Sequence, residues 1–539
     1  MILALAAFAG GVIVGSGSGG AERQLVTNYV RAWRHDDYQA MYALLDRSSR
    51  QRLTAGEFVA EFRQAADTAT LISVLPVRVG GLNGGVISVS MLARTRLFGE
   101  LHEPLLVSID ETSSGPQVRF TGTLLFPGLR AGEQLHRMAL LGPRGALLAS
   151  NGTPLAEGPN RTSPIPGIAG GIVGQLGAIP TDEATTYAAL GYPPAAKVGQ
   201  DGLERVFQLQ LAGTPGGTLF AGARVLAHVA TIAGHAVTTT INPSIEAAAI
   251  QALGGRYGGI AAMDPRTGHI LALVGLAFSV LQPPGSTMKI ITSTAALQAG
   301  IVNLSSTFPI ASSATIEGYT LHNAGGEYCG GTLLNAFAVS CNSVFAPLGA
   351  QVGAARLVST AMRFGFDQPM SIPGAAESLI PSASTIGDSL AVGSSAIGQG
   401  KVLASPLEMT DVAATIAMGG QRPIPTLDAS QAPRFASVTS ARIAGLVQRM
   451  MVAVVDYGTG TAAQIPGVQV AGKTGTAELV STASPASSLP QNTDAWFVGY
   501  APVGAPRIVA GALFPGQGAG GATAAPAVQQ VLAAGLHAG

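Results

Sequence analysis

The sequence predicts a multidomain α/β protein, and three observations support this prediction. A chain of 539 residues is longer than a single hydrophobic core usually holds, so several domains are expected. Hydrophobic residues make up 47% of the chain and charged residues 11%, which is typical of folded domains and not of disordered segments. The predicted elements also change along the chain, from helices followed by strands, through a Pro- and Gly-rich stretch, to strands separated by a long helical segment.

Residues 1–19 are expected to form a single N-terminal membrane anchor, with a cleaved signal segment as the alternative. Residues 1–14 are apolar, and a linker of Gly and Ser follows. This apolar run is shorter than the ~20 residues that a spanning helix needs, and no positive charge precedes it. We therefore interpret it as an anchor whose basic flank lies before the printed start. Both interpretations place the rest of the chain outside the cytoplasm.

Residues 20–128 predict a small α+β domain with a curved sheet. Helical patterns cover residues 21–45 and 53–66, and strands follow them. Residues 129–240 combine short strands with Pro- and Gly-rich turns, which is typical of a linker module. The α+β domain of residues 20–128 is expected to contain four strands, over residues 71–79, 86–97, 101–110 and 118–125.

Residues 241–539 predict one sheet whose strands are separated by a helical subdomain. A helix over residues 245–253 precedes a hairpin over residues 258–274, and the sequence Asp264-Pro-Arg-Thr-Gly268 favours its tight turn. A mostly helical segment is expected over residues 286–418. The remaining elements are strands over residues 469–479, 495–501 and 507–513 and a helix over residues 525–536.

The strongest functional signal is Ser286, in the stretch Gln282-Pro-Pro-Gly-Ser286-Thr-Met-Lys289. Positions i and i+3 of a helix lie on one face, so the hydroxyl and the amine come within reach of each other. Lys289 is the only formally charged residue between Arg266 and Glu317, and such apolar surroundings lower the pKa of an amine. A neutral lysine beside a hydroxyl is a base that can activate a nucleophile. The alternative is a buried lysine stem whose amine reaches water.

Two further motifs place polar groups in apolar surroundings. Ser340 and Asn342 lie in a predicted helical segment without charges, where an ordinary core serine bonded to a carbonyl is the alternative. Lys473-Thr474-Gly475-Thr476 lies on a predicted strand, where a lysine that protects a sheet edge is the alternative. The chain contains only four lysines, and two of them, Lys289 and Lys473, occur in the three motifs, which argues against coincidence. The cleft between sheet and helices would receive Ser286, Ser340 and Lys473 together.

The order Ser-x-x-Lys, Ser-x-Asn, Lys-Thr-Gly resembles the active-site set of penicillin-binding proteins and serine β-lactamases. Gly398-Gln-Gly400 and Asp494-Ala-Trp-Phe-Val-Gly499 resemble further segments of that domain, and Gly202-Leu-Glu204 is similar to the linker module of class B penicillin-binding proteins. Residues 21–126 resemble the NTF2-like domain that precedes some transpeptidases. The resemblance implies a penicillin-binding transpeptidase fold, an antiparallel sheet flanked by helices with a helical subdomain, preceded by an NTF2-like domain and a linker/dimerisation module. Arg144-Gly145 departs from the linker signature because it lacks the expected acidic residue.

The resemblance also implies an activity, that of a peptidoglycan D,D-transpeptidase. Ser286 would attack the carbonyl of a D-Ala-D-Ala terminus or a β-lactam and form an acyl-enzyme, with Lys289 as the base. Ser340 would relay a proton to the leaving amine, and Asn342 would hold the substrate backbone.

The motif on the predicted strand is expected to bind the substrate. Lys473 and the hydroxyls of Thr474 and Thr476 would bind its terminal carboxylate, and the N–H groups of Ser286 and Thr476 would form an oxyanion hole. The expected ligands are peptidoglycan stem peptides and β-lactam antibiotics. A membrane-embedded glycosyltransferase is the expected partner, because no such domain is recognisable before the linker.

Several alternatives compete with this interpretation. A D,D-carboxypeptidase or β-lactamase of the same fold would hydrolyse the acyl-enzyme with water. A class A β-lactamase needs a glutamate for that step, and Glu377 and Glu408, the only glutamates between Asn342 and Lys473, lack an Asn four residues later. A non-catalytic β-lactam sensor or cell-wall scaffold is the alternative from another class.

Other site types receive little support. The run Gly467-Val-Gln-Val-Ala-Gly-Lys-Thr474 matches a phosphate-loop pattern, but its middle residues favour a strand and Thr-Gly-Thr is a poor helix start. The formal net charge is zero and no Lys/Arg-rich run occurs, so nucleic-acid binding is not expected. The histidines lack zinc-site spacing, and neither a metal nor a cofactor is expected. Cys329 and Cys341 could form a disulfide, or Cys341 could be a small buried thiol.

Overall fold

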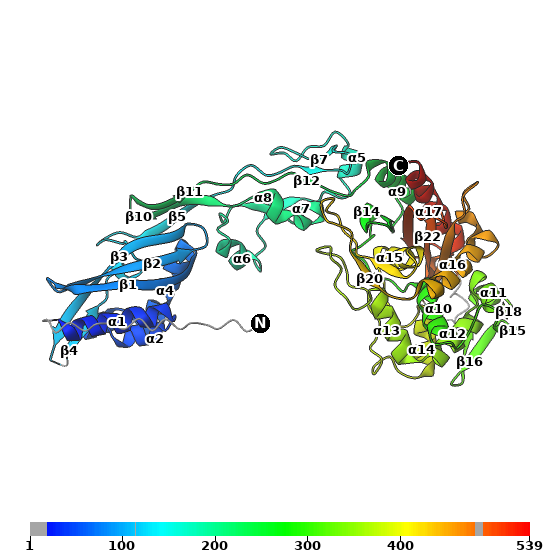
Figure 1. The fold of residues 1–539 in the computed structure, drawn as a ribbon, viewed down its shortest axis with the longest axis horizontal. Helices are drawn as coiled ribbons and strands as arrows, with labels where there is room; N and C mark the ends of the chain where they lie inside the picture. The colour runs from blue at the N-terminus through cyan, green and yellow to red at the C-terminus, as the bar shows by residue number, and fades with distance from the viewer. Residues whose placement is uncertain (1–18, 114, 480–488, 539) are drawn as a thin grey trace. The chain divides into compact units, whose positions relative to one another are not determined.

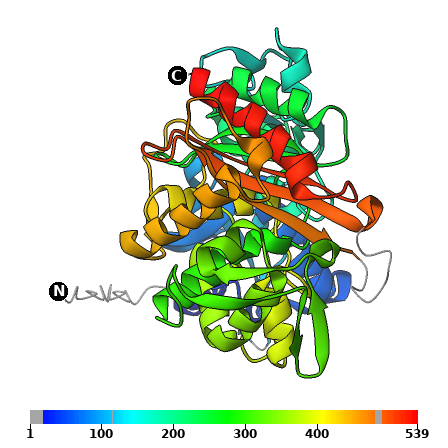
Figure 2. The same cartoon turned by 90° about the vertical axis from the view of Figure 1, so that its right-hand side faces the viewer.

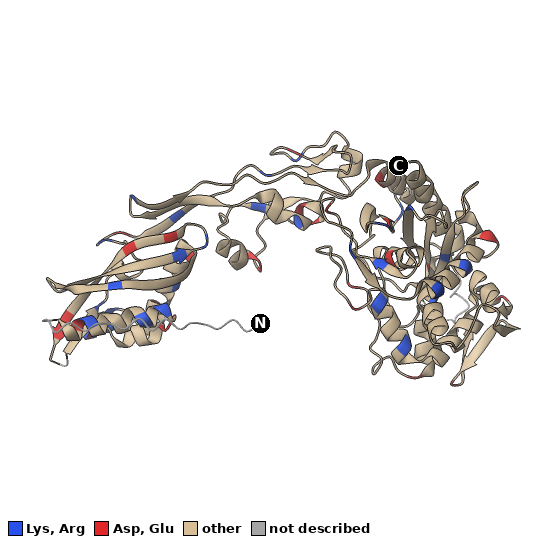
Figure 3. Ribbon diagram, in the orientation of Figure 1, with Lys and Arg blue, Asp and Glu red and all other residues tan. Residues whose placement is uncertain are grey.

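The computed structural model describes residues 19–113, 115–479 and 489–538. The predicted N-terminal anchor, residues 1–19, therefore lies almost wholly outside the described residues. Within the described part of the chain, no helix has both the length and the apolar composition needed to cross a membrane. The chain forms two compact units, and residues 129–240 are distributed over both. Figure 3 shows Lys and Arg interspersed with Asp and Glu in each unit.

The first unit comprises residues up to Gly145, with Gly177–Val198 and Ala212–His235. Four helices precede a four-stranded antiparallel sheet of order β1-β2-β3-β4, and a second sheet has the order β11-β10-β5. The aromatic rings of Trp33, Phe58 and Phe62 pack in one core with the sheet. The main elements are α1 (Gly20–Arg34), α2 (Tyr38–Ala43), α3 (Arg47–Arg52), α4 (Ala55–Ala69), β1 (Leu71–Asn83), β2 (Val86–Thr95), β3 (Gly99–Thr112), β4 (Gly115–Arg119), β5 (Leu135–Leu140), α6 (Ala184–Ala189), β10 (Gly216–Ala221) and β11 (Arg224–Val229).

Two predicted boundaries in this unit are wrong. The helix expected over residues 21–45 is broken after α1, because Asp36 adopts a left-handed conformation (φ 55°) and Asp37 caps the start of α2 with its side chain. The fourth strand is β4, which ends at Arg119, and a short 3₁₀ turn replaces the rest of the expected strand. The start of α4 follows local rules, since Thr54 and Glu57 form a capping box.

The second unit contains the predicted sheet, which is antiparallel, has five strands and has the order β14-β13-β23-β22-β21. Successive residues of a strand point to opposite faces. Thus Phe497 of β22 packs with α9 and α17 on one face, whereas Trp496 packs with α10, α15 and α16 on the other. Figure 2 shows α17 (red) on one side of the strands of this sheet and the lower green helices on the other. These elements are α9 (Pro243–Leu253), β13 (Gly259–Asp264), β14 (His269–Gly275), α10 (Lys289–Gln298), α15 (Pro406–Ala417), α16 (Ala441–Asp456), β21 (Ala471–Glu478), β22 (Thr493–Ala501), β23 (Ile508–Phe514) and α17 (Gly520–His537).

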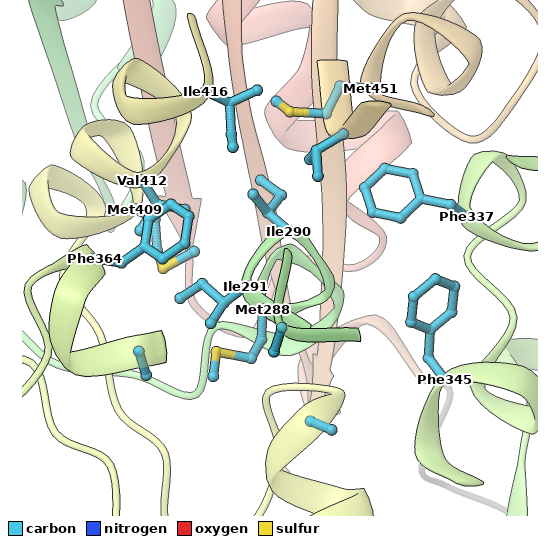
Figure 4. Close-up of a cluster of buried hydrophobic side chains, with 14 of the residues drawn as sticks. Met288, Ile290, Ile291, Phe337, Phe345, Phe364, Met409, Val412, Ile416 and Met451 are labelled. Carbon is cyan, nitrogen blue, oxygen red and sulfur yellow. The ribbon is translucent and has the colours of Figure 1, made fainter. Parts of the chain in front are cut away.

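The helical subdomain surrounds α10, which is buried along nearly its whole length. Figure 4 shows Ile290 and Ile291 of α10 among Phe337, Phe345 and Phe364 from neighbouring helices. Helices are the main regular elements of this segment, but they cover less than half of residues 286–418, and the segment also contains small hairpins that were not predicted. Its further elements are η2 (Gly285–Met288), β15 (Thr307–Ala311), β16 (Ser313–Ile316), β17 (Tyr319–His322), β18 (Cys329–Thr332), α11 (Leu333–Ala338), α12 (Asn342–Val352), α13 (Ala354–Phe364) and α14 (Ser389–Ala396).

The linker residues of the second unit share a hydrophobic cluster and contain a buried ion pair. Arg161 donates to Glu204 at 2.6 Å, and the Glu204 side chain is only 1% exposed. Removal of either partner would leave an uncompensated buried charge, which is strongly destabilising. The elements around it are β6 (Leu147–Leu148), β7 (Pro154–Ala156), α5 (Pro166–Ala169), α7 (Gly202–Val206), α8 (Gln208–Ala212) and β12 (Val237–Thr238).

Candidate active site

Ser286 lies in the 3₁₀ turn η2, directly before α10, and Lys289 is the first residue of that helix. The Lys289 Nζ donates to the Ser286 Oγ at 2.8 Å. Gly285 allows this arrangement because it has a positive φ of 52°, which a residue with a Cβ rarely adopts. The hydroxyl and the amine therefore meet one turn apart.

The amine of Lys289 is fully buried. Besides Ser286, its Nζ lies within hydrogen-bond distance of the Ser340 carbonyl (2.7 Å), the Asn342 Oδ1 (2.8 Å) and the Ser340 Oγ (3.3 Å). Burial, and then the charge of Lys473, hold the pKa of Lys289 well below its usual range. A neutral amine has a lone pair that can accept the Ser286 hydroxyl proton, so the environment favours a base at this position.

Ser340 occupies a break between two helices, which corrects the prediction of a continuous helical segment. Helix α11 ends at Ala338 and α12 begins at Asn342. Ser340 between them has a left-handed backbone with φ 63°. This conformation directs its carbonyl to Lys289, and its Oγ lies between Lys289 and Lys473, at 3.3 Å and 2.9 Å from the two Nζ atoms.

Lys473 approaches the same point from the sheet. It lies in β21 and is fully buried, so the interpretation as a solvent-exposed lysine that protects a sheet edge is wrong. Its Nζ donates to the Ser340 Oγ at 2.9 Å and to the Thr474 carbonyl at 3.0 Å. Burial lowers the pKa of Lys473 to about 7. The strand also contradicts the phosphate-loop interpretation, because that motif needs a loop before the lysine and a helix after it.

Glycines allow the sheet to approach the nucleophile closely. A Cβ on Gly475 would lie 2.8 Å from the Pro284 carbonyl oxygen and 2.8 Å from the Trp496 Cβ. A Cβ on Gly398 would lie 2.0 Å from the Gly285 carbonyl oxygen. The Gly of the Lys-Thr-Gly motif is thus required by packing.

The wall opposite β21 is tied to the Ser340 turn. The Asn342 Nδ2 donates to the His322 carbonyl at 3.1 Å, and the Asn323 Oδ1 accepts from the Ser343 N–H at 2.8 Å. Cys329 and Cys341 form a disulfide, with Cα atoms 5.8 Å apart, so the pairing interpretation of the cysteines is correct and the free-thiol alternative is wrong.

These residues line one cleft of about 570 Å³. Ser286, Ser340, Asn342, Thr474 and Thr476 contribute to it, and both lysines lie beneath its floor. Several polar residues of the cleft were not predicted because they belong to none of the motifs. Among them are Thr459, whose hydroxyl lies 2.5 Å from that of Thr474, Thr461 and Glu478.

Comparison with known protein families identifies the family to which the sequence belongs. The family model described as penicillin binding protein transpeptidase domain matches residues 258–533, which is more than half of the chain. The chain belongs to this transpeptidase family. The model described as penicillin-binding protein dimerisation domain matches residues 150–223 of this penicillin-binding protein.

Two individual relatives of this chain are both named as peptidoglycan D,D-transpeptidases. The peptidoglycan D,D-transpeptidase PbpA of Mycobacterium tuberculosis is 33% identical over 366 residues, which cover 56% of this chain and 73% of PbpA. The peptidoglycan D,D-transpeptidase MrdA of Acinetobacter baumannii is 26% identical over 469 residues, which cover 74% of this chain and 66% of MrdA.

Solved structures also resemble this penicillin-binding protein. The imipenem acyl-enzyme complex of penicillin-binding protein A from M. tuberculosis has a TM-score of 0.59 at 27% identity and covers 73% of this chain and 99% of its own. The D,D-transpeptidase domain of a peptidoglycan glycosyltransferase from Eggerthella lenta has a TM-score of 0.60 at 29% identity, covering 74% and 98%.

Proposed function

We propose that this penicillin-binding protein is a serine D,D-transpeptidase that crosslinks peptidoglycan stem peptides. The observation that carries the proposal is the continuous chain of contacts from the Ser286 hydroxyl through Lys289 and Ser340 to Lys473. These contacts support Ser286 as the nucleophile, Lys289 as the base and Ser340 as the proton relay.

In the first step the neutral Lys289 accepts the Ser286 hydroxyl proton, and the Ser286 Oγ forms a bond to the carbonyl carbon of the penultimate D-Ala. The tetrahedral oxyanion is stabilised by the N–H groups of Ser286 and Thr476. The C–N bond then breaks, and the leaving amine of the terminal D-Ala receives a proton from Lys289 through the Ser340 Oγ. The product is a Ser286 ester, and a β-lactam reacts in the same way through its own amide bond.

The substrate is held at both sides of the scissile bond. The ammonium of Lys473 and the hydroxyls of Thr474 and Thr476 bind the terminal carboxylate, and Asn342 donates to the substrate backbone. The carboxylate partly neutralises the charge on Lys473, whose pKa burial lowers to about 7. Gly475 contributes close approach and not a functional group.

In the second step an amine of a neighbouring stem peptide attacks the ester carbonyl carbon, the C–O bond to Ser286 breaks, and a proton of the amine returns to the Ser286 Oγ through Lys289, which completes the crosslink. Attack by water would make the protein a carboxypeptidase or β-lactamase. The glutamates considered for such a hydrolytic role offer little support, since Glu377 is exposed, Glu408 is fully buried, and neither lines the described cleft.

The remaining parts fit a cell-wall synthase held at the membrane. We infer that residues 20–128 are an NTF2-like domain, supported by helices packed against one four-stranded antiparallel sheet. We also infer an N-terminal anchor in residues 1–19, an extracytoplasmic catalytic domain and a membrane-embedded glycosyltransferase as partner, because crosslinking requires newly polymerised strands.

Fluorescent penicillin tests the serine chemistry. We expect covalent labelling of the 21–539 fragment, with the adduct located on Ser286 by mass spectrometry. Lys289→Ala should abolish labelling because it removes the base, whereas Lys473→Ala should weaken labelling because it removes a carboxylate ligand. Equal labelling of wild type and Lys289→Ala would contradict the assigned base. Product analysis with paired stem peptides then separates crosslinking from hydrolysis.

A further inference from the structure

Glu478 is a carboxylate in the cleft that the proposed mechanism does not use. It is the last residue of β21 and alternates with Thr474 and Thr476 on the side of the strand that lines the cleft. Its side chain is half-buried and, among the described residues, forms neither a hydrogen bond nor an ion pair. Charged side chains are sparse in this part of the molecule (Figure 3), and the other carboxylate lining the cleft, Glu327, is exposed.

The contacts of β21 indicate in which direction along the strand a bound donor peptide, the one that acylates Ser286, would run. Its terminal carboxylate lies at Lys473, Thr474 and Thr476 in the proposed function. The nucleophile turn packs beside the next residues, because a Cβ on Gly285 would lie 3.0 Å from the Ala477 N and 3.1 Å from the Thr476 carbonyl carbon. A peptide that extends from the carboxylate past the nucleophile therefore continues towards Glu478.

The length of the peptide matches this path. Extended chains advance about 3.3 Å per residue, so Glu478 lies about 13 Å along β21 from Thr474. The residue before the two D-alanines lies roughly 8 Å from the terminal carboxylate along the same direction. A side chain that ends in an amine spans the remaining distance.

We propose that Glu478 binds a cationic side chain on the donor residue that precedes D-Ala-D-Ala, and so selects stem peptides with a free amine at that position. This inference rests on the proposed transpeptidase function and adds its donor specificity. Partial burial raises the pKa of Glu478, which is expected of a carboxylate without a partner, and an ammonium would supply the missing charge. A half-buried ion pair of this kind is expected to raise the affinity for a peptide with a free amine about tenfold over a peptide without one.

Competition with fluorescent penicillin measures this preference without requiring turnover. Two peptides ending in Lys-D-Ala-D-Ala are compared, one with a free lysine amine and one with that amine acetylated. For each protein, the concentration of each peptide that halves the labelling rate is determined. The value for the acetylated peptide is then divided by the value for the peptide with the free amine. Because the ratio is taken within one protein, a change in the labelling rate itself cancels.

The wild-type protein should favour the free amine about tenfold, and Glu478→Gln should lower the ratio to near one. Glu478→Lys should instead favour a succinylated side chain, which a purely structural role of Glu478 would not produce. Glu327→Gln, a matched change on an exposed cleft carboxylate, should keep the wild-type ratio.

Equal competition by both peptides in the wild type, or equal loss of preference in Glu327→Gln and Glu478→Gln, would overturn the inference. Wild-type labelling with no preference would leave the serine chemistry standing. Absence of wild-type labelling would be a failure of the serine chemistry, and the inference would fall with it.

Discussion

Replacing Gly475 with Ala tests whether the nucleophile turn and the sheet are held as tightly as the structure indicates. The new Cβ would lie 2.8 Å from the Pro284 carbonyl oxygen, 2.8 Å from the Trp496 Cβ and 3.1 Å from the Thr287 Cγ2. Non-bonded carbon atoms prefer separations of about 3.5–4.0 Å, so contacts must open by roughly half an ångström or more. These contacts belong to the nucleophile turn and to β22, so both elements have to shift.

The magnitude follows from this displacement. Overpacking of this kind typically costs about 1–3 kcal/mol in the free energy of unfolding. A misplacement of about 1 Å can lower a reaction rate about 100-fold, so a shift of half that size is expected to slow acylation about tenfold. The fold should persist, because the variant adds a single methyl group.

The assay combines thermal unfolding with the second-order rate of labelling by fluorescent penicillin. Gly445→Ala is the matched control, since Gly445 lies inside α16 and a Cβ there would meet no atom within 4 Å. The control should keep the wild-type rate and gain up to about 1 kcal/mol from helix propensity. A Gly475→Ala protein with wild-type stability and rate would refute the packing argument.

Two further predictions concern stability. Reduction of the Cys329–Cys341 disulfide should lower the free energy of unfolding by about 3 kcal/mol, the magnitude expected for a loop of this length. It should also slow acylation, because Cys341 adjoins Ser340. A Cys329→Ala/Cys341→Ala protein should not respond to reductant, and a response equal to that of the wild type would contradict the assignment. Burial raises the pKa of Glu246 from 4.5 to about 8, so the folded protein keeps a proton that the unfolded chain releases, and stability should fall by about 1.4 kcal/mol per pH unit between these values. Denaturant unfolding at pH 5 and pH 7 should show a loss that is larger in the wild type than in Glu246→Gln, whose amide oxygen can still accept from the Leu273 N–H, because the buried Glu408 and Asp411 keep raised pKa values in both proteins. Equal losses in the two proteins would contradict the burial argument.

The residues with a purely local signal were predictable from the sequence. Lys289 stood out because a charge in a long apolar run has few explanations, and the structure shows it fully buried. The strands and helices around the sheet followed from their periodicity, with boundaries within a few residues for β21, β22 and β23. The alternation of β21 also placed Lys473 on a strand rather than in a phosphate loop.

The features that depend on tertiary contacts were not predictable. Neither neighbour of the left-handed Ser340 is Gly, Asn or Pro, and Asn342, two residues later, is the nearest residue of that kind. The conformation of Ser340 is held by the hydrogen bond from Lys289 to its carbonyl and by the adjoining disulfide. Thr459 comes close to Thr474 only because α16 ends beside β21, and no spacing in the sequence encodes that contact. The break at Asp36 was a missed local signal, because consecutive Asp residues favour both a left-handed residue and a helix cap.

The two lysines explain how one amine can serve as base and then as acid in the proposed mechanism. Their Nζ atoms lie 3.3 Å and 2.9 Å from the same Ser340 Oγ, so they are no more than about 6.2 Å apart. At an effective dielectric constant of about 20, two positive charges at that separation repel each other by about 3 kcal/mol. When Lys289 takes the Ser286 proton, the charge on Lys473 therefore drives that proton onward, and the Ser340 hydroxyl provides the path to the leaving amine. Burial is the larger cause of the lowered pKa of Lys289, and the same repulsion adds to it, so in the proposed mechanism the lysine assigned to the carboxylate also contributes to the basicity of Lys289.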